Sequence, residues 1–308
     1  MEKSSFHIKP TAIVNTLSKV VVTLFFTPAV VLADGNSVYQ HQIGLENIAA
    51  TLQNFENSDE NTLKQDQEGA QNTAEGVQKE ESGSGIAQVQ DGAFNRSQTQ
   101  QQYGSKNQIN SVQVGAQNTS AILQSVNYGS SASSRQGGFG NKAQLNQLNG
   151  NFNEIRISQT GIANQASGTQ SNAFYADNFT EQHGNDNSAA VDQSGVDHFS
   201  ATVQEGAFNR AQVDQDGALQ EASLVQDGLA NQAVLLQSDE YNIISANQNG
   251  NFNQTLIQQQ GIGSLGGNHR SIVNQVGTFN TSVISQTGVS SAATITQFGN
   301  GNSVSLSH

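Results

Sequence analysis

The sequence predicts an all-β protein, a β-solenoid of about 11 coils in which each coil of 22–23 residues contributes one strand to each of two facing parallel sheets. Three observations lead to this fold class. Gln recurs every 11 or 12 residues along most of the chain, apolar and polar residues alternate between the Gln residues, and no Pro follows Pro28. Alternation with a period of two is the signature of strands, and the absence of Pro leaves every backbone N–H able to join a sheet.

The composition excludes an ordinary globular core. The 308 residues include 34 Asn and 40 Gln, only 34% are hydrophobic, and the formal net charge is −13. Such a chain is either disordered or a repeat protein whose polar side chains bond one another in an ordered array. The acidity argues against a nucleic-acid partner, because such a partner requires a basic surface. The absence of Cys excludes disulfides.

Residues 1–33 resemble an export signal. Lys3, Lys9 and Lys19 form a basic front, the 13-residue apolar run "VVVTLFFTPAVVL" follows, and Ala33 offers a cleavage site. We therefore expect a secreted protein with three parts: a signal peptide (1–33), a short leader (34–41) and a repeat solenoid (42–308).

The repeat unit places Gln at its first position, Gly at the third, Asn at the sixth, a small residue at the eighth and a larger apolar residue at the tenth. The fainter upstream units are placed at Gln90, Gln102 and Gln113. Position six carries His198 and His269 in two units, and the long step between Gln259 and Gln275 predicts an enlarged turn. The Gln and Asn residues expected to face inward include Gln182, Gln193, Gln204, Gln215, Gln226, Gln248, Gln275, Gln286, Gln297, Asn164, Asn187, Asn209, Asn231, Asn253, Asn280 and Asn302.

A strand of about six residues followed by a tight turn fills one unit, so two units close one coil. The glycine residues expected to form the turns are Gly161, Gly184, Gly206, Gly217, Gly228, Gly250, Gly277 and Gly288. Gly suits such positions because it has no Cβ. A side-chain amide both donates and accepts, so like amides stacked one coil apart can bond one another along the axis.

The pattern Gln-x-Gly-x-x-Asn-x-Ala-x-x-x-Gln, unbroken in "QEGAFNRAQVDQ" (204–215) and "QDGLANQAVLLQ" (226–237), resembles the repeat of the curlins, subunits of bacterial curli fibres. The resemblance implies an extracellular amyloid of the biofilm matrix, with adhesive function, built from copies of itself and other curlin subunits. It also implies export through an outer-membrane pore with accessory factors. The units are more similar to those of the minor, nucleating subunit than to those of the major one.

Charge is distributed unevenly along the repeats. Acidic residues crowd the front and middle, whereas Arg270 is the only formally charged residue after Glu240. Stacked like charges repel, so we expect acidic coils to resist self-association and the neutral coils from Gln275 to His308 to start it. The residues expected to act as such gatekeepers in the middle are Asp214, Asp216, Asp227 and Asp239. The repeat also continues to His308 with no polar cap in sequence.

No other chemistry is indicated. The His residues lack ligand spacing, no nucleophile motif stands out, and we expect no enzyme activity, cofactor or metal. Five fifth-position Phe residues either pack along the turns or project for lateral contacts: Phe94, Phe152, Phe208, Phe252 and Phe279. The leading interpretation is a structural subunit or nucleator of an extracellular fibre. The alternative is a soluble β-solenoid adhesin or binding module at the cell surface.

Overall fold

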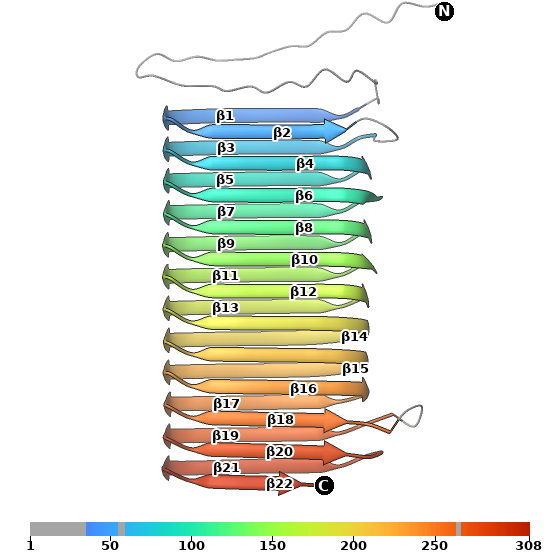
Figure 1. The fold of residues 1–308 in the computed structure, drawn as a ribbon, viewed down its shortest axis with the longest axis vertical. Coiled ribbons are helices and arrows are strands. Elements are labelled where there is room, and N and C mark those ends of the chain that lie inside the picture. The colour runs from blue at the N-terminus through green and yellow to red at the C-terminus, as the bar shows by residue number, and fades with distance from the viewer. Residues whose placement is uncertain (1–34, 55–58, 263–265) are drawn as a thin grey trace, which may run out of the picture.

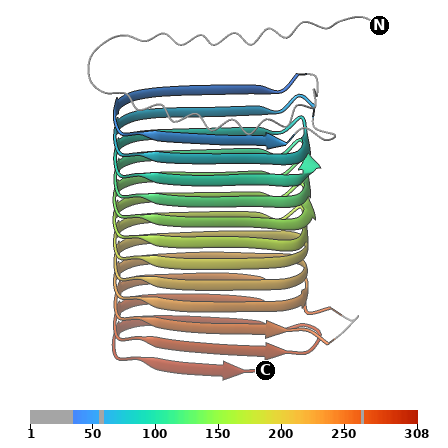
Figure 2. The ribbon, with the colours of Figure 1, turned by 45° about the horizontal axis from the view of Figure 1, so that its top comes forward.

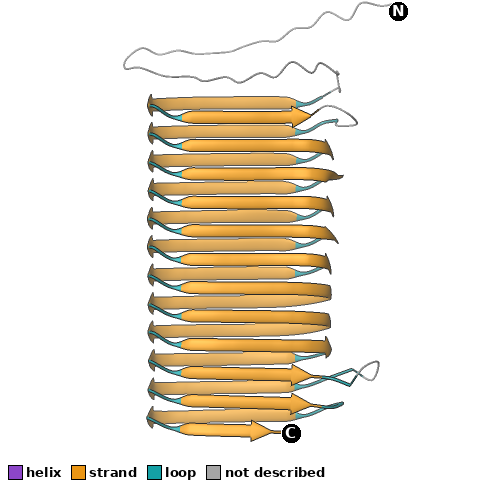
Figure 3. Ribbon diagram, viewed as in Figure 1, coloured by secondary structure: helices purple, strands orange, loops and turns teal. Residues whose placement is uncertain are grey.

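A computed structural model describes residues 35–54, 59–262 and 266–308, and the expected signal peptide lies outside these residues. The described chain is a single stack of parallel strands with about 11 turns of roughly 23 residues, as the sequence predicts (Figures 1 and 3). The described residues include no helix long and apolar enough to cross a membrane. The tilted view in Figure 2 shows that the strands lie in two layers, one behind the other.

Each strand pairs in parallel with the strand two places on in sequence, so that odd and even strands form separate layers. Sheet 1 contains β1 (Ser37–Leu45), β3 (Thr62–Ala70), β5 (Gly85–Ala93), β7 (Gln108–Ala116), β9 (Ser131–Phe139), β11 (Glu154–Ile162), β13 (Asp177–Asn185), β17 (Ile243–Asn251), β19 (Arg270–Thr278) and β21 (Ala292–Asn300). Sheet 2 contains β2 (Ile48–Asn54), β4 (Thr73–Ser82), β6 (Arg96–Ser105), β8 (Thr119–Tyr128), β10 (Lys142–Asn151), β12 (Gln165–Phe174), β16 (Gln232–Glu240), β18 (Gln254–Gln260), β20 (Thr281–Thr287) and β22 (Ser303–Ser307).

Two long strands, β14 (Ser188–Ala207) and β15 (Arg210–Leu229), each belong to both layers. Their first halves continue sheet 2 and their second halves continue sheet 1. The first strand begins at Ser37, within the segment 34–41 that the sequence suggested as a leader. The stack therefore starts one strand earlier than the first sequence-derived unit.

Two kinds of turn connect the sheets. Arc A leads from sheet 1 to sheet 2 and forms the regular left edge of Figure 1. Arc B leads from sheet 2 back to sheet 1 and forms the right edge. The connections 55–61 and 261–269 both belong to arc B, and part of each lies outside the described residues.

The space between the sheets is filled by alternate side chains, as the burial of every second residue in β7 and β16 shows. Apolar side chains form two clusters, one from Leu63 to Ala166 and one from Ala189 to Ile295. Between the clusters, buried polar residues replace the apolar ones: Asn178, Thr180, Ser200 and Thr202. The core is thus continuous in its amides but not in its hydrocarbon.

Candidate assembly interface

The recurring Gln side chains form two separate ladders, one in each sheet. In sheet 1, twelve consecutive rungs from Gln42 to Gln297 are joined by hydrogen bonds in which each Nε2 donates to the next Oε1 over 2.6–3.0 Å. In sheet 2 the same bond joins Gln53 to Gln286 over 2.7–3.1 Å. Every amide dipole in a ladder points the same way, so each ladder has a donor end and an acceptor end.

The predicted Gln residues are divided between these ladders. Sheet 1 holds Gln182, Gln204, Gln226, Gln248, Gln275 and Gln297, and sheet 2 holds Gln193, Gln215 and Gln286. The second Nε2 hydrogen usually bonds a backbone carbonyl of the opposite sheet, as from Gln226 to Arg210 at 3.0 Å. Each buried amide is thereby satisfied both along and across the stack.

The sequence placed one rung wrongly. Gln101, not Gln102, lies in the sheet 2 ladder between Gln78 and Gln124, and Gln102 points outward. Two consecutive Gln residues made the choice ambiguous, and the unit lengths then looked irregular. With Gln101 in place, every step across arc A is 11 residues, and all longer steps cross arc B.

Arc A carries an unbroken Asn ladder. From Asn72 to Asn302, each Asn backbone N–H donates to the Oδ1 of the Asn one coil earlier at 3.0–3.1 Å. The Nδ2 group donates to the carbonyl of the turn Gly one coil later, as from Asn231 to Gly250 at 2.8 Å. The predicted residues Asn164, Asn187, Asn209, Asn231, Asn253, Asn280 and Asn302 all belong to this ladder.

The turn glycines of arc A have no room for a side chain. Gly228 has a φ of 121°, and a Cβ there would lie 2.0 Å from the carbonyl oxygen of Gly250. Six of the predicted glycines stack in this way at arc A: Gly161, Gly184, Gly206, Gly228, Gly250 and Gly277. The other two, Gly217 and Gly288, lie at arc B, with φ of 131° and 122°.

Arc B has no uniform ladder. The position that Asn occupies at arc A is filled here by Asn61, Ser84, Asn107, Ser130, Asn153, Ala176, His198, Gln220, Asn242, His269 and Ser291. His269 takes this place after the enlarged turn, and its backbone N–H donates to Asn242 Oδ1 at 3.1 Å. Both histidines are buried and substitute for Asn. Burial lowers the pKa of His198, which is hydrogen-bonded to the Ser194 carbonyl at 2.8 Å.

A third amide ladder in the first coils escaped the sequence reading. Gln40, Gln65 and Gln88 occupy the tenth position in sheet 1, where later coils place apolar residues, and their amides bond one another at 2.8 Å. Gln88 then donates to Ser97 Oγ at 2.9 Å, and Ser97 bonds Ser111. The strict alternation of buried positions in β3 and β5 was the signal that could have identified these residues.

The expected gatekeepers lie on the outside of the stack. Asp214 is beside Asp192 of the preceding coil, and Asp227 is beside Glu205, so like charges meet at one strand spacing. Partial burial, Asp192 and Asp216 raise the pKa of Asp214. Asp216 accepts a 2.7 Å hydrogen bond from Ser194, and Asp239 replaces Gly at arc B with a φ of 72°.

The fifth-position Phe residues are on both edges. Phe152 lies at arc B, stacked on Tyr175 with centroids 5.3 Å apart, whereas Phe252 and Phe279 stack at arc A at 5.0 Å. Phe94 and Phe208 are 56% and 54% exposed. The described residues contain no group of three or more His, Asp or Glu arranged to hold a metal ion.

The first and last coils present the same rung. Gln42, Gly44 and Asn47 in the first coil correspond to Gln297, Gly299 and Asn302 in the last. In the described part of the chain, no strand lies beyond β1 and β2 at one end or beyond β21 and β22 at the other. Each end therefore exposes strand edges that match the opposite end of a second copy.

Comparison with known families gives an independent match to these repeats. The model of the curlin associated repeat matches residues 184–217 and 272–299. No curated protein matches the chain. The matched segments include the Gln, Gly and Asn rungs described above, and the same rungs recur in the coils between and before them. The chain is a member of the curlin family, built from curlin associated repeats.

Proposed function

We propose that this protein is a structural subunit or nucleator of an extracellular, curli-like fibre, formed by end-to-end stacking of solenoids. The observation that carries the proposal is the polarity of the ladders combined with the identity of the first and last rungs. At the C-terminal end, Gln297 Nε2 faces outward with no further Gln to bond, and at the other end Gln42 offers its Oε1. A second copy supplies both partners.

The proposed junction keeps the register found inside the molecule. β21 of one copy pairs with β1 of the next so that Gln297 meets Gln42 and Gly299 meets Gly44, while β22 pairs with β2. The backbone edges then continue the parallel sheets by strand addition. Buried amides that find a partner avoid a desolvation cost of about 1–3 kcal/mol each, which favours this register over a shifted one.

Charge supports a directional start of assembly. The last coils, from Gln275 to His308, carry no formal charge on their side chains apart from titratable His308, whereas the first coils carry Glu46, Asp66 and Glu68. Repulsion is smallest where neutral coils meet, so the C-terminal coils are the proposed initiation surface and the acidic coils, including Asp214, Asp216, Asp227 and Asp239, the gatekeepers.

The biological setting follows from the family and is part of the proposal. A curlin-type subunit is secreted, through an outer-membrane pore with accessory factors, and contributes to the biofilm matrix and to adhesion. Its partners are further copies of itself and other curlin subunits. Curlins are structural subunits rather than enzymes, and this chain is expected to act in the same way.

A soluble adhesin is the second candidate. It is favoured by exposed aromatic side chains along both edges, such as Tyr175 at 58% and Phe279 at 61% exposure. An adhesin and a fibre subunit differ in one property: the adhesin does not polymerise.

The experiment is an assembly assay on residues 34–308 diluted from denaturant at low micromolar concentration. Thioflavin T fluorescence that rises after a lag, together with a meridional reflection near ~4.7 Å, is the expected result. A β-rich monomer that forms no fibres over days would reject the fibre subunit and leave the adhesin.

A further inference from the structure

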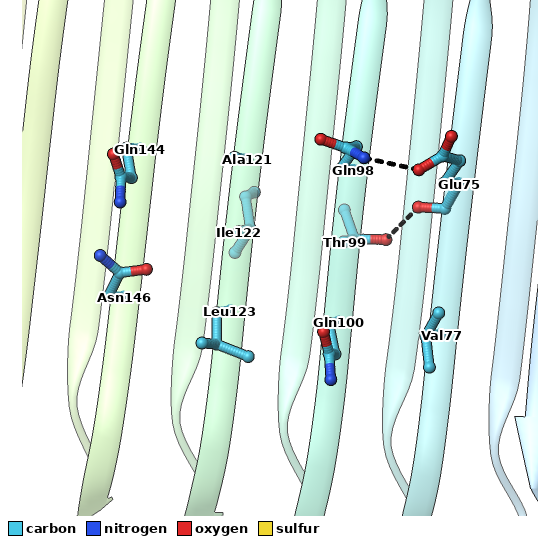
Figure 4. A pocket seen from close by; sticks show the side chains of 10 residues that line it. All are labelled: Glu75, Val77, Gln98, Thr99, Gln100, Ala121, Ile122, Leu123, Gln144 and Asn146. Atoms are coloured by element: carbon cyan, nitrogen blue, oxygen red, sulfur yellow. Dashed lines mark hydrogen bonds between the residues drawn. The ribbon is translucent and has the colours of Figure 1, made fainter.

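The outer faces of the two sheets differ in a way that the fibre proposal does not use. Outward side chains stand in columns along the axis, and on each sheet a groove runs between two neighbouring columns. On sheet 2 this groove has a volume of about 250 Å³ and is lined by Glu75, Gln98, Gln144 and other residues (Figure 4). Its end at Glu75 is acidic, and Gln98 donates to that carboxylate at 2.6 Å.

The groove on sheet 1 is larger and cationic. Its volume is about 580 Å³, and it spans five coils, from Asn110 and Val112 in β7 to Ala201 and Val203 in β14. At about 4.8 Å per coil, the distance from the first of these coils to the last is about 19 Å. Small side chains in the two columns, Ser133, Ser158 and Ala201, leave the groove open along this length.

Two guanidinium groups flank the groove from opposite columns in consecutive coils. Arg135 extends from β9 in one column, and Arg156 extends from β11 in the other, because the register pairs Arg156 with Ser133 and Ser158 with Arg135. Arg156 lies 3.7 Å from Glu154, but Arg135 forms no ion pair with any carboxylate of the described residues. Residues 92–153, which include Arg135, contain no Asp or Glu in an otherwise acidic chain.

Beyond the arginines the groove becomes aromatic and apolar. The Arg156 guanidinium lies 5.8 Å from the centre of the Phe179 ring, and Ala201 and Val203 follow in the next coil. Glu181 faces Phe179 across the groove and is hydrogen-bonded to His183 at 2.8 Å. A negative group is therefore favoured at the arginines and disfavoured one to two coils further along, which gives the groove a direction.

We propose that the sheet 1 groove binds elongated aromatic carboxylates or sulfonates. The acid group lies between Arg135 and Arg156, where guanidinium groups form charge-assisted hydrogen bonds with planar or tetrahedral oxyanions. The flat body lies along the solenoid axis against Phe179, Ala201 and Val203. Because the groove runs along a sheet face and not an end, it is present in a single molecule and in a fibre alike.

The test compares two fluorescent probes with the same aromatic body, one with a sulfonate and one without. The anionic probe is 1-anilinonaphthalene-8-sulfonate, and the neutral probe is N-phenyl-1-naphthylamine. Both are titrated into the full chain, before and after assembly. The double variant Arg135→Gln/Arg156→Gln is expected to weaken binding of the anionic probe about tenfold and to leave the neutral probe unchanged.

The matched control is Arg96→Gln/Arg210→Gln, which removes the same charge from sheet 2 and is expected to change neither affinity. Phe179→Ser is expected to weaken both probes. Equal loss of the anionic probe in the control, or unchanged affinity in the Arg135/Arg156 variant, would overturn the proposal. Failure of the chain to polymerise would not, since binding is measured on the monomer as well.

Discussion

The two edges of the solenoid obey different rules, although the same chain builds both. At arc A every step is 11 residues, every turn has the same Gly, and every rung has the same Asn. At arc B the steps range from 11 to 16 residues, and seven residue positions replace Asn with Ser, Ala, His or Gln. The difference shows that the register is held by one edge and both Gln ladders, while the other edge absorbs variation.

The physical cause lies in the contacts of each turn. At arc A, each Asn bonds the coil before it and the coil after it, and each Gly lies against the next Gly carbonyl, so that no atom can be added without breaking several bonds. At arc B, non-Gly residues such as Val126 adopt a positive φ near 57° and extend into solvent. An extra residue there enlarges the turn without shifting the strands.

Insertion of one residue tests this difference with the largest expected effect. A Gly inserted between Ala230 and Asn231 at arc A displaces an Asn rung or shifts the register of β16, and we expect destabilisation of more than ~3 kcal/mol. The same insertion between Ala218 and Leu219 at arc B lengthens a step from 11 to 12, a length that five other coils already use. We expect a change within about 1 kcal/mol there. Denaturant unfolding of the two variants measures both values, and equal losses would contradict the account.

Substitution of the turn residues gives the next largest difference. In Gly228→Ala the new Cβ meets the Gly250 carbonyl and the backbone has a φ of 121°, so a loss of ~3 kcal/mol is expected. Val126→Ala, at an exposed arc B position of the same kind, should alter stability by less than ~0.5 kcal/mol. Thermal unfolding monitored by circular dichroism compares them. Similar melting temperatures for the two variants would show that arc A tolerates a side chain.

Removal of the rung side chains should separate the edges more modestly. Asn231→Ala deletes the bond to Gly250 and leaves the Asn253 N–H without its acceptor, at an expected cost of 2–4 kcal/mol, roughly one to two unsatisfied groups. Ser130→Ala at arc B removes only a 3.2 Å bond from the Asn153 N–H and a weaker contact. We expect ~1 kcal/mol for this change, again from denaturant unfolding. A larger loss for Ser130→Ala would reverse the assignment of the edges.

The smallest expected effect is a pH dependence that comes from arc B, where both buried titratable groups of the turns lie. Burial raises the pKa of Glu81 and lowers that of His198. Since the folded state binds a proton on Glu81 more tightly than the unfolded state, stability rises as pH falls through the raised pKa toward 4.5. Since it binds one on His198 less tightly, stability falls as pH drops below 6.5.

Two variants isolate these contributions. Glu81→Gln should stabilise the protein at pH 7 and have no such advantage below about pH 4. His198→Asn should reduce the loss of stability between pH 7 and pH 5, while leaving pH 7 little changed. Unfolding curves at each pH measure both effects, and a pH profile unaffected by either variant would remove arc B as the source.

The sequence was sufficient to predict the solenoid, its period and its inward residues, because Gln, Gly and Asn recur at fixed positions and strands alternate with a period of two. It was not sufficient to separate the two arcs. A single repeat unit hides the fact that consecutive units turn in different environments, and the choice of Gln102 over Gln101 concealed the constant step at arc A. The Gln40–Gln65–Gln88 ladder was missed because those residues occupy a position that is apolar in later coils.

The most direct test of the central claim, end-to-end stacking in register, uses two introduced cysteines in a chain that has none. Thr296 and His41 lie in the same outward column, at the last and first coils of sheet 1, so Thr296→Cys/His41→Cys places two thiols one strand spacing apart across the proposed junction. Oxidised fibres of this variant should give a covalent ladder of multimers on denaturing gels. The control Thr296→Cys/Tyr39→Cys, two residues out of register, should not. Multimers from the control alone, or from neither variant in fibres that do assemble, would contradict the proposed junction.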